Sequence, residues 1–220
     1  MKRRFLASML LALLAAIPAS AEPKRKKPTA SGGKFDYYLL VLSFAPDFCD
    51  QPTGNKDPRE CGPGRKIGFI VHGLWPQNET SRGPENCGSS PVAPSVIQAT
   101  LSYIPSESLI QHEWKAHGSC TGMTAADYFS TLRRARDSVK IPPDLDQPSQ
   151  KVQLSPAEVE SKMASANPTF PASAFRTSCY RGNQELQEVR ICVTKDLSPR
   201  ACTQSAGECT LPNVTLLPVK

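Results

Sequence analysis

The sequence predicts an α+β domain, with a central antiparallel sheet that helices flank and disulfides stabilise. Strand-like segments come first, helical segments follow, and strands return after Pro171, without the strand–helix–strand alternation of a parallel sheet. The eight Cys residues form an even set without a C-x-x-C pair, which favours four structural disulfides over a zinc ribbon or redox motif. A length of 220 residues, 39% of them hydrophobic and 21% charged, is typical of a single globular domain.

The N-terminal part of the chain is predicted to lie outside this domain. Residues 1–21 combine three basic residues, a short apolar run and a final Ala-Ser-Ala, the pattern of a secretory signal peptide, with an uncleaved anchor as the alternative. Residues 22–33 read as a flexible basic leader, and the domain covers 34–220. Within it 19 basic residues balance 19 acidic ones, so a generally basic surface is not indicated. We expect a secreted or periplasmic protein with no membrane association after signal cleavage.

The first half of the domain contains two predicted strands and two predicted helices. Strands are expected over 35–44 and 66–72, because aromatic and branched residues gather there between loops rich in Gly, Pro and Asn. The segments 95–103 and 108–117 are expected to be helical. A loop is predicted to follow each strand.

The second half of the domain shows more clearly where helices begin. Thr124 precedes Asp127 by three residues, as in a capping box, and Ser155 is followed by Pro and then by Glu158 at the third helical position. Two further helices are therefore predicted. Past Pro171 a strand of period two is predicted from Val189, Ile191 and Val193, an alternation that Leu186 breaks.

All three His residues fall in two short segments, H-G-L-W-P-Q from His72 and H-E-W-K-A-H-G from His112. On a helix, His112, Glu113 and His117 would share one arc of about 140°. Trp114 lies outside this arc and is expected to pack into the core. The pKa of His lies near neutrality, so two imidazoles beside a carboxylate suit proton transfer.

Several kinds of site remain possible at this point. A three-His zinc site completed by His72 is open, although the i, i+5 spacing of His112 and His117 differs from the i, i+4 spacing of metalloproteases. No G-x-S-x-G elbow is present, and an even Cys count leaves no thiol for a nucleophile. RNA can be cleaved through its own 2′-hydroxyl, in a reaction where one imidazole removes the hydroxyl proton, a second protonates the 5′-oxygen, and nearby groups stabilise the charge at phosphorus. This reaction needs no metal or cofactor.

The two segments resemble the active-site motifs of the ribonuclease T(2) family: His72-Gly73-Leu74-Trp75-Pro76, and His112-Glu113-Trp114 with His117-Gly118-Ser119-Cys120. The likeness extends to residues 37–44, to Cys49 and to the C-terminal Cys cluster, and so covers most of 35–210. It implies an α+β endoribonuclease that cleaves single-stranded RNA to 2′,3′-cyclic phosphates and then hydrolyses them to 3′-phosphates. We expect RNA as the partner, no cofactor, no metal and a monomer.

The resemblance also implies roles for single residues. His117 corresponds to the general base, His72 to the general acid, His112 to the imidazole that holds the phosphate, and Glu113 to a stabiliser of the transition state. Two imidazoles in opposite roles predict a bell-shaped pH profile, with a rate that changes between about pH 4 and about pH 9. The implied disulfide pairs are Cys49–Cys61, Cys87–Cys120, Cys179–Cys209 and Cys192–Cys202.

The substrate-binding positions are Trp75, Gln77 and Lys115. Trp75 resembles the aromatic residue that lines a base pocket, with an ordinary core Trp as the alternative, and Gln77 stands where some relatives carry an acidic base-contacting residue. Family members usually have Lys directly before the last His, whereas here Ala116 occupies that position and Lys115 precedes it. We therefore expect a working but slower enzyme, in which Lys115 or an arginine elsewhere substitutes in part. The alternative is a nucleotide- or RNA-binding protein on the same fold, with weakened catalysis.

Overall fold

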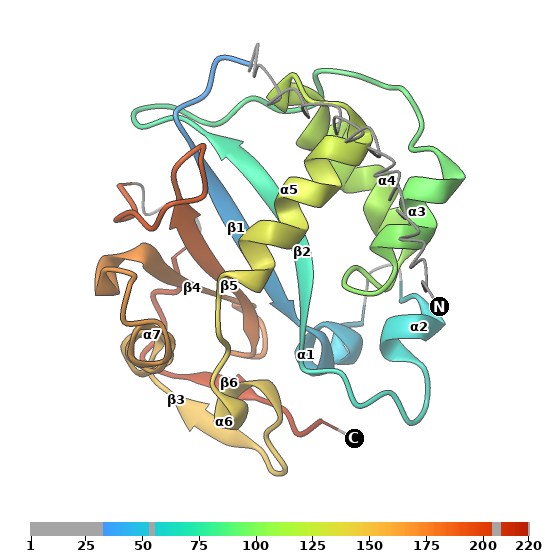
Figure 1. Ribbon diagram of the computed structural model, residues 1–220. Coiled ribbons are helices and arrows are strands. Elements are labelled where there is room, and N and C mark those ends of the chain that lie inside the picture. Colours follow the sequence, from blue (N-terminus) through green and yellow to red (C-terminus); the bar gives the residue numbers. More distant parts are fainter. Residues whose placement is uncertain (1–32, 53–55, 204–207, 220) are drawn as a thin grey trace, which may run out of the picture.

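The computed structural model describes residues 33–52, 56–203 and 208–219 (Figure 1). The predicted signal peptide and almost all of the predicted basic leader lie outside the described residues. No helix in the described part of the chain is long and apolar enough to cross a membrane.

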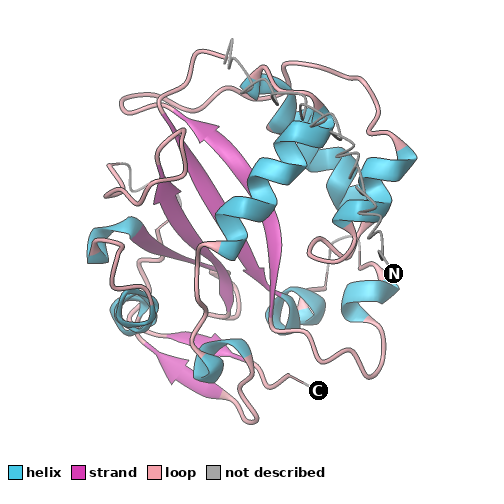
Figure 2. Ribbon diagram, in the orientation of Figure 1, coloured by secondary structure: helices cyan, strands magenta, loops and turns pink. Residues whose placement is uncertain are grey.

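The centre of the fold is a four-stranded antiparallel sheet with the strand order β2-β1-β5-β4 (Figure 2). A second, two-stranded antiparallel sheet pairs β3 with β6. Their bounds are β1 Tyr37–Phe44, β2 Phe69–Gln77, β3 Val152–Leu154, β4 Phe175–Cys179, β5 Leu186–Val193 and β6 Val214–Leu216. The antiparallel sheet that the sequence predicts is confirmed.

Helices flank this sheet, as Figure 1 shows, with α5 crossing in front of β1 and β2 and α7 lying near β4. Thr124 and Ser155 cap α5 and α7 as predicted, and Ser155 forms a complete capping box with Glu158. The helices are α1 Ala45–Asp50, α2 Pro58–Cys61, α3 Pro94–Thr100, α4 Glu107–Ala116, α5 Ala125–Asp137, α6 Pro143–Asp146 and α7 Pro156–Ala166, with 3₁₀ helices η1 Gly118–Thr121 and η2 Ala172–Ala174.

The two faces of β1 have different roles. Leu40, Leu42 and Phe44 are fully buried in the main core, which they share with aromatic residues of α5 such as Tyr128. Ser43, on the other face, is only partly buried. One face of β1 therefore contributes to the core, whereas the polar Ser43 lies on the other face.

The bounds of three predicted elements need correction. The predicted strand 66–72 is shifted, because β2 begins at Phe69 and continues through Trp75 and Pro76 to Gln77. Pro76 is tolerated because β2 is an edge strand, where a missing N–H interrupts no ladder on the open side. The predicted helices 95–103 and 108–117 end earlier, at Thr100 and Ala116.

The broken alternation at Leu186 has a structural cause. Ser178 of β4 pairs with Glu188, but the next residue of β4, Cys179, pairs with Leu186. Gln187 is therefore an extra residue in β5, and this bulge returns Leu186 to the buried face.

Four disulfides connect the loops to this framework. Their pairs are those that the family resemblance implies: Cys49–Cys61, Cys87–Cys120, Cys179–Cys209 and Cys192–Cys202. Cys192–Cys202 and Cys179–Cys209 attach the C-terminal segment to the central sheet. The Cys87–Cys120 bridge joins a long loop to η1, directly after the second His motif.

Candidate active site

His72 lies in β2, at an irregularity of the sheet. Val41 of β1 pairs with Gly73 and Leu42 pairs with Val71, so His72 is the extra residue of a β-bulge. Bulges occur next to active sites because they redirect a side chain that regular pairing would place elsewhere. The Nδ1 atom of His72 lies 2.7 Å from Glu188 Oε1 and 3.2 Å from Ser43 Oγ.

The second motif lies on α4 and just beyond its end. Ser106 caps the helix by accepting the N–H of Leu109. Glu113 is completely buried, whereas the side chain of His112 is 65% exposed. Trp114 packs in the core as predicted, and its indole N–H donates to the Ser90 carbonyl at 2.9 Å.

His117 is the C-terminal cap of α4 and not a member of the helix, with φ −126° and ψ −51°. Its backbone N–H still donates to the Glu113 carbonyl at 3.0 Å, which keeps it close to the last turn. The helical-wheel prediction is therefore right about the common side of His112, Glu113 and His117, but it misplaces the helix end by one residue.

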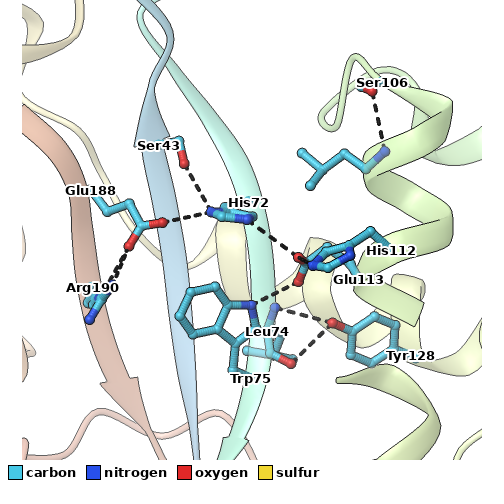
Figure 3. Close-up of polar contacts among 11 residues, drawn as sticks. Ser43, His72, Leu74, Trp75, Ser106, His112, Glu113, Tyr128, Glu188 and Arg190 are labelled. Carbon is cyan, nitrogen blue, oxygen red and sulfur yellow. Dashed lines mark hydrogen bonds and ion pairs between the residues drawn. The ribbon is translucent and has the colours of Figure 1, made fainter. Parts of the chain in front are cut away.

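The Glu113 carboxylate lies between the imidazoles (Figure 3). The Trp75 indole N–H donates to Oε2 at 2.8 Å. The other oxygen, Oε1, lies 3.4 Å from His72 Nε2 and 4.0 Å from His112 Nε2. The structure thus brings two residues of the first motif together with two of the second.

Trp75 and His117 form the other side of the site. Their rings stack with centroids 4.9 Å apart and an interplanar angle of 26°. The His72 ring meets the Trp75 ring edge-on at 5.3 Å, and the Arg190 guanidinium lies 5.5 Å from the centre of the indole. Trp75 therefore belongs to the histidine cluster and lies outside the main core.

The surroundings shift the pKa values of His72 and His117 in opposite directions. Burial lowers the pKa of His72, but the hydrogen bond to Glu188 and the charges of Glu113 and Glu188 outweigh it and raise this pKa to about 9. Burial, together with the positive charges of His72 and His112, lowers the pKa of His117 to about 4. At neutral pH His72 is therefore protonated and His117 is neutral.

The carboxylate between them is also perturbed. Burial raises the pKa of Glu113 to about 7, against the opposing effects of His72 and the Trp75 hydrogen bond. For the exposed His112, partial burial and the nearby charges of His72 and Lys115 lower the pKa.

A pocket of about 400 Å³ opens beside His72 and His112. Its walls combine apolar side chains with polar ones: Phe48, Ile70, Leu109, Tyr180, Ser106 and Gln187. Mixed walls of this kind suit a planar ring with polar edges.

Gln77 and Lys115 lie at the periphery. Gln77 ends β2, and its backbone carbonyl accepts the N–H of Asp36 at 2.7 Å. Lys115 is exposed on the last turn of α4, next to the buried Ala116. Neither side chain forms a hydrogen bond or ion pair with another described residue. Within the described ranges, no three His, Cys, Asp or Glu side chains are grouped to hold a metal ion.

The sequence reasoning missed Ser43, Glu188, Arg190 and Tyr128. Glu188 and Arg190 alternate with core residues in β5, a signal that charged side chains share one face of a buried strand. The Tyr128 hydroxyl donates to the Leu74 carbonyl at 3.1 Å and lies 3.3 Å from the Leu74 N–H, thereby fixing β2 between His72 and Trp75. Nothing in the local sequence points to Ser43 or Tyr128.

An α+β fold that places imidazoles around a buried carboxylate is suited to a nuclease. The chain belongs to the Ribonuclease T2 family, whose model matches residues 35–202.

Two curated relatives are ribonucleases by name. A "Probable ribonuclease" of Haemophilus influenzae is 36% identical over 156 residues, which cover 65% of this chain but only 54% of that protein. The "Ribonuclease" of Aeromonas hydrophila is 29% identical over 165 residues, which cover 74% of each chain.

Solved structures share the fold. Trichomaglin, described as an S-like ribonuclease, superposes with a TM-score of 0.68 at 19% identity, over 85% of this chain and all of that one (100%). An RNase-related protein from Calystegia sepium superposes with a TM-score of 0.67 at 23% identity, over 84% of this chain and 98% of that one. A mutant of RNase MC1 in complex with 5′-UMP superposes with a TM-score of 0.61 at 23% identity, over 82% of this chain and 97% of that one.

Proposed function

We propose that this protein is a secreted or periplasmic, metal-independent endoribonuclease that cleaves single-stranded RNA. The observation that carries the proposal is the grouping of His72, Glu113, Trp75 and His117, in surroundings that raise the pKa of His72 and lower that of His117. Two titratable groups whose surroundings separate their pKa values are suited to act as acid and base in one reaction. Membership of the Ribonuclease T2 family and the names of the curated relatives support this activity.

In the first step, neutral His117 removes the proton from the ribose 2′-hydroxyl. The 2′-oxygen attacks the neighbouring phosphorus, the bond from phosphorus to the 5′-oxygen breaks, and protonated His72 gives its Nε2 proton to that oxygen. His112 holds the phosphate, and Glu113 helps to stabilise the transition state at the pentacoordinate phosphorus. The products are a 2′,3′-cyclic phosphate and a free 5′-hydroxyl.

In the second step the two imidazoles exchange roles. His72, now neutral, removes a proton from water, and the water oxygen attacks the phosphorus of the cyclic phosphate. His117, now protonated, returns its proton to the 2′-oxygen, which leaves a 3′-phosphate and restores both starting states. DNA lacks the attacking hydroxyl and would be bound without being cut.

The substrate would contact both sides of the histidine cluster. One nucleoside would stack near Trp75, since stacking tolerates every base. The other would enter the pocket beside His72 and His112. The complex of the RNase MC1 mutant with 5′-UMP is consistent with nucleotide binding on this fold. We propose that the protein acts as a monomer, with Gln77 and Lys115 as peripheral contacts to RNA.

The test is a digest of a defined RNA by mature protein in excess EDTA, with the product ends identified by mass. We expect 2′,3′-cyclic phosphate ends early and 3′-phosphates later. Cleavage only after addition of zinc would replace this proposal by a metal site. Absence of cleavage with any metal, together with retained RNA affinity, would favour the alternative of a binding protein in which Ala116 weakens catalysis.

The rate of RNA cleavage is expected to follow a broad bell in pH. His117 must be neutral, so kcat/KM should rise as pH increases through about 4. His72 must be protonated, so it should fall as pH increases through about 9. The two limbs of the bell therefore lie near the ends of the range from about pH 4 to about pH 9 in which the sequence predicts a change of rate. Initial rates on a dinucleotide between pH 3 and 10 would check this, and a single peak only about two pH units wide would contradict it.

A further inference from the structure

We propose that Glu188 is a positioning residue that holds Nδ1 of His72, so that Nε2 is the atom that delivers the proton, and that Arg190 holds Glu188 for this task. The inference rests on the proposed function, since it assigns the support of the group named there as the acid. It adds a carboxylate from β5 to a reaction otherwise carried by residues of β2 and α4.

The geometry of Glu188 fits a dedicated support. Its side chain is only 2% exposed, and both of its oxygens are engaged. Oε1 lies 2.7 Å from His72 Nδ1, and Oε2 accepts from Arg190 Nε at 2.9 Å and from Arg190 Nη2 at 2.7 Å. A carboxylate held in this way fixes the orientation of the ring and keeps a proton on Nδ1.

The contacts continue in a closed ring (Figure 3). Arg190 lies over the Trp75 indole, Trp75 donates to Glu113, and Glu113 Oε1 lies 3.4 Å from His72 Nε2. The two nitrogens of His72 therefore face two different carboxylates. Only the Nε2 side also faces His112 and the remainder of the catalytic cluster, because Glu113 Oε1 lies 4.0 Å from His112 Nε2.

Strand pairing explains why Glu188 can reach His72. Ser43 of β1 pairs with Glu188 on one side and with Ile70 on the other. The bulge inserts His72 two residues beyond Ile70, which turns its ring toward Ser43 and Glu188 across the central strand. The contact between Glu188 and His72 thus depends on the register of β1 with β2 and on the register of β1 with β5.

Several charged groups face His72 from the elements packed around it. They are Glu188 and Arg190 on β5, His112 and Glu113 on α4, His117 at its cap, and Glu60 on α2. The hydrogen bond that His72 Nδ1 donates to Glu188 is the largest influence that raises the pKa of His72 against the effect of burial, and Arg190 opposes it. Removing the charge of Glu188 should therefore have the clearest effect.

The test is Glu188→Gln, which keeps the shape of the side chain and removes its charge. Because the chain has only three His residues, NMR titration of the imidazole signals measures the pKa of His72 directly. We expect that pKa to fall by at least about one unit, since an opposite charge at hydrogen-bond distance shifts a pKa by about 1–3 units. The alkaline limb of the kcat/KM profile should move to lower pH by the same number of pH units.

Three variants serve as controls. Glu188→Asp keeps the charge and should restore part of the lost pKa shift. Ser43→Ala removes the neutral contact to Nδ1 and should move the pKa of His72 by less than about 0.3 unit. Glu185→Gln removes another buried carboxylate of the same region, one that bonds Gln51 and Asn183 instead, and should leave the titration of His72 unchanged.

The outcomes separate this inference from the proposed function. If RNA is not cleaved by the unmodified protein, the proposed function fails, while the NMR titration still reads the contact between Glu188 and His72. If Glu188→Gln leaves the pKa of His72 unchanged in a folded protein, Glu188 does not support His72 and the inference is overturned. If that pKa falls but the alkaline limb stays in place, His72 does not deliver the proton, and the inference is overturned as well.

Discussion

Replacing His117 with Ala is expected to lower kcat for RNA cleavage by about 10²–10⁴-fold, the usual contribution of a positioned general base. His117 is neutral at physiological pH because burial and two neighbouring imidazoles lower its pKa to about 4. No other imidazole of the described cluster is stacked on Trp75, so the attacking hydroxyl would lose the proton acceptor held there. Single-turnover rates on a defined RNA would measure the loss.

Binding should respond differently to the same substitution. The affinity for a 2′-deoxy oligonucleotide, which cannot be cleaved, should stay within about threefold, because in the proposed complex most phosphate and base contacts would come from other side chains. The acid limb of the pH profile should also disappear. A variant that retained a rate within about tenfold of the unmodified protein would show that another group removes the proton.

Replacing Gly73 with Ala is expected to disable the site although this residue has no reactive group. A Cβ at position 73 would lie 1.9 Å from Glu113 Oε2 and 2.5 Å from Trp75 Nε1, the two atoms of one hydrogen bond. Neither atom can move freely, because Glu113 is buried and Trp75 is stacked against His117. A displacement of about 1 Å in such a site costs about 10²-fold in rate.

The same change should lower the free energy of unfolding by about 1–3 kcal/mol, the usual cost of overpacking. Gly182→Ala is the matched control, since a Cβ there would meet nothing within 4 Å, and it should retain both rate and stability. Urea unfolding and initial rates would be compared for the two variants. Unchanged cleavage by Gly73→Ala would mean that the Glu113–Trp75 contact is not needed for catalysis.

The sequence alone predicts which residues of the second motif lie together, because that information is local. His112, Glu113 and His117 are close in sequence, so the period of a helix was enough to place them together. The caps at Thr124 and Ser155 are likewise interactions over three residues. The family motifs added the link to His72, which no periodicity could supply.

The sequence could not show how the site is charged. His72 owes its raised pKa to Glu188 and Glu113, and Glu188 lies 116 residues further along the chain. The bulge that inserts His72 depends on the register between β1 and β2, and the position of Glu188 depends on the register between β1 and β5. Such pairings carry no local signature in composition or spacing.

Helix ends show the same division on a smaller scale. The sequence predicts that His117 belongs to the helix, but in the structure it is the C-terminal cap of α4, where its ring stacks on Trp75 of β2. The sequence by itself therefore determined the class of fold, the histidine cluster and the number of disulfides. Only the tertiary structure decided which imidazole is charged and which is neutral, because burial and partner charges arise when distant strands and helices meet.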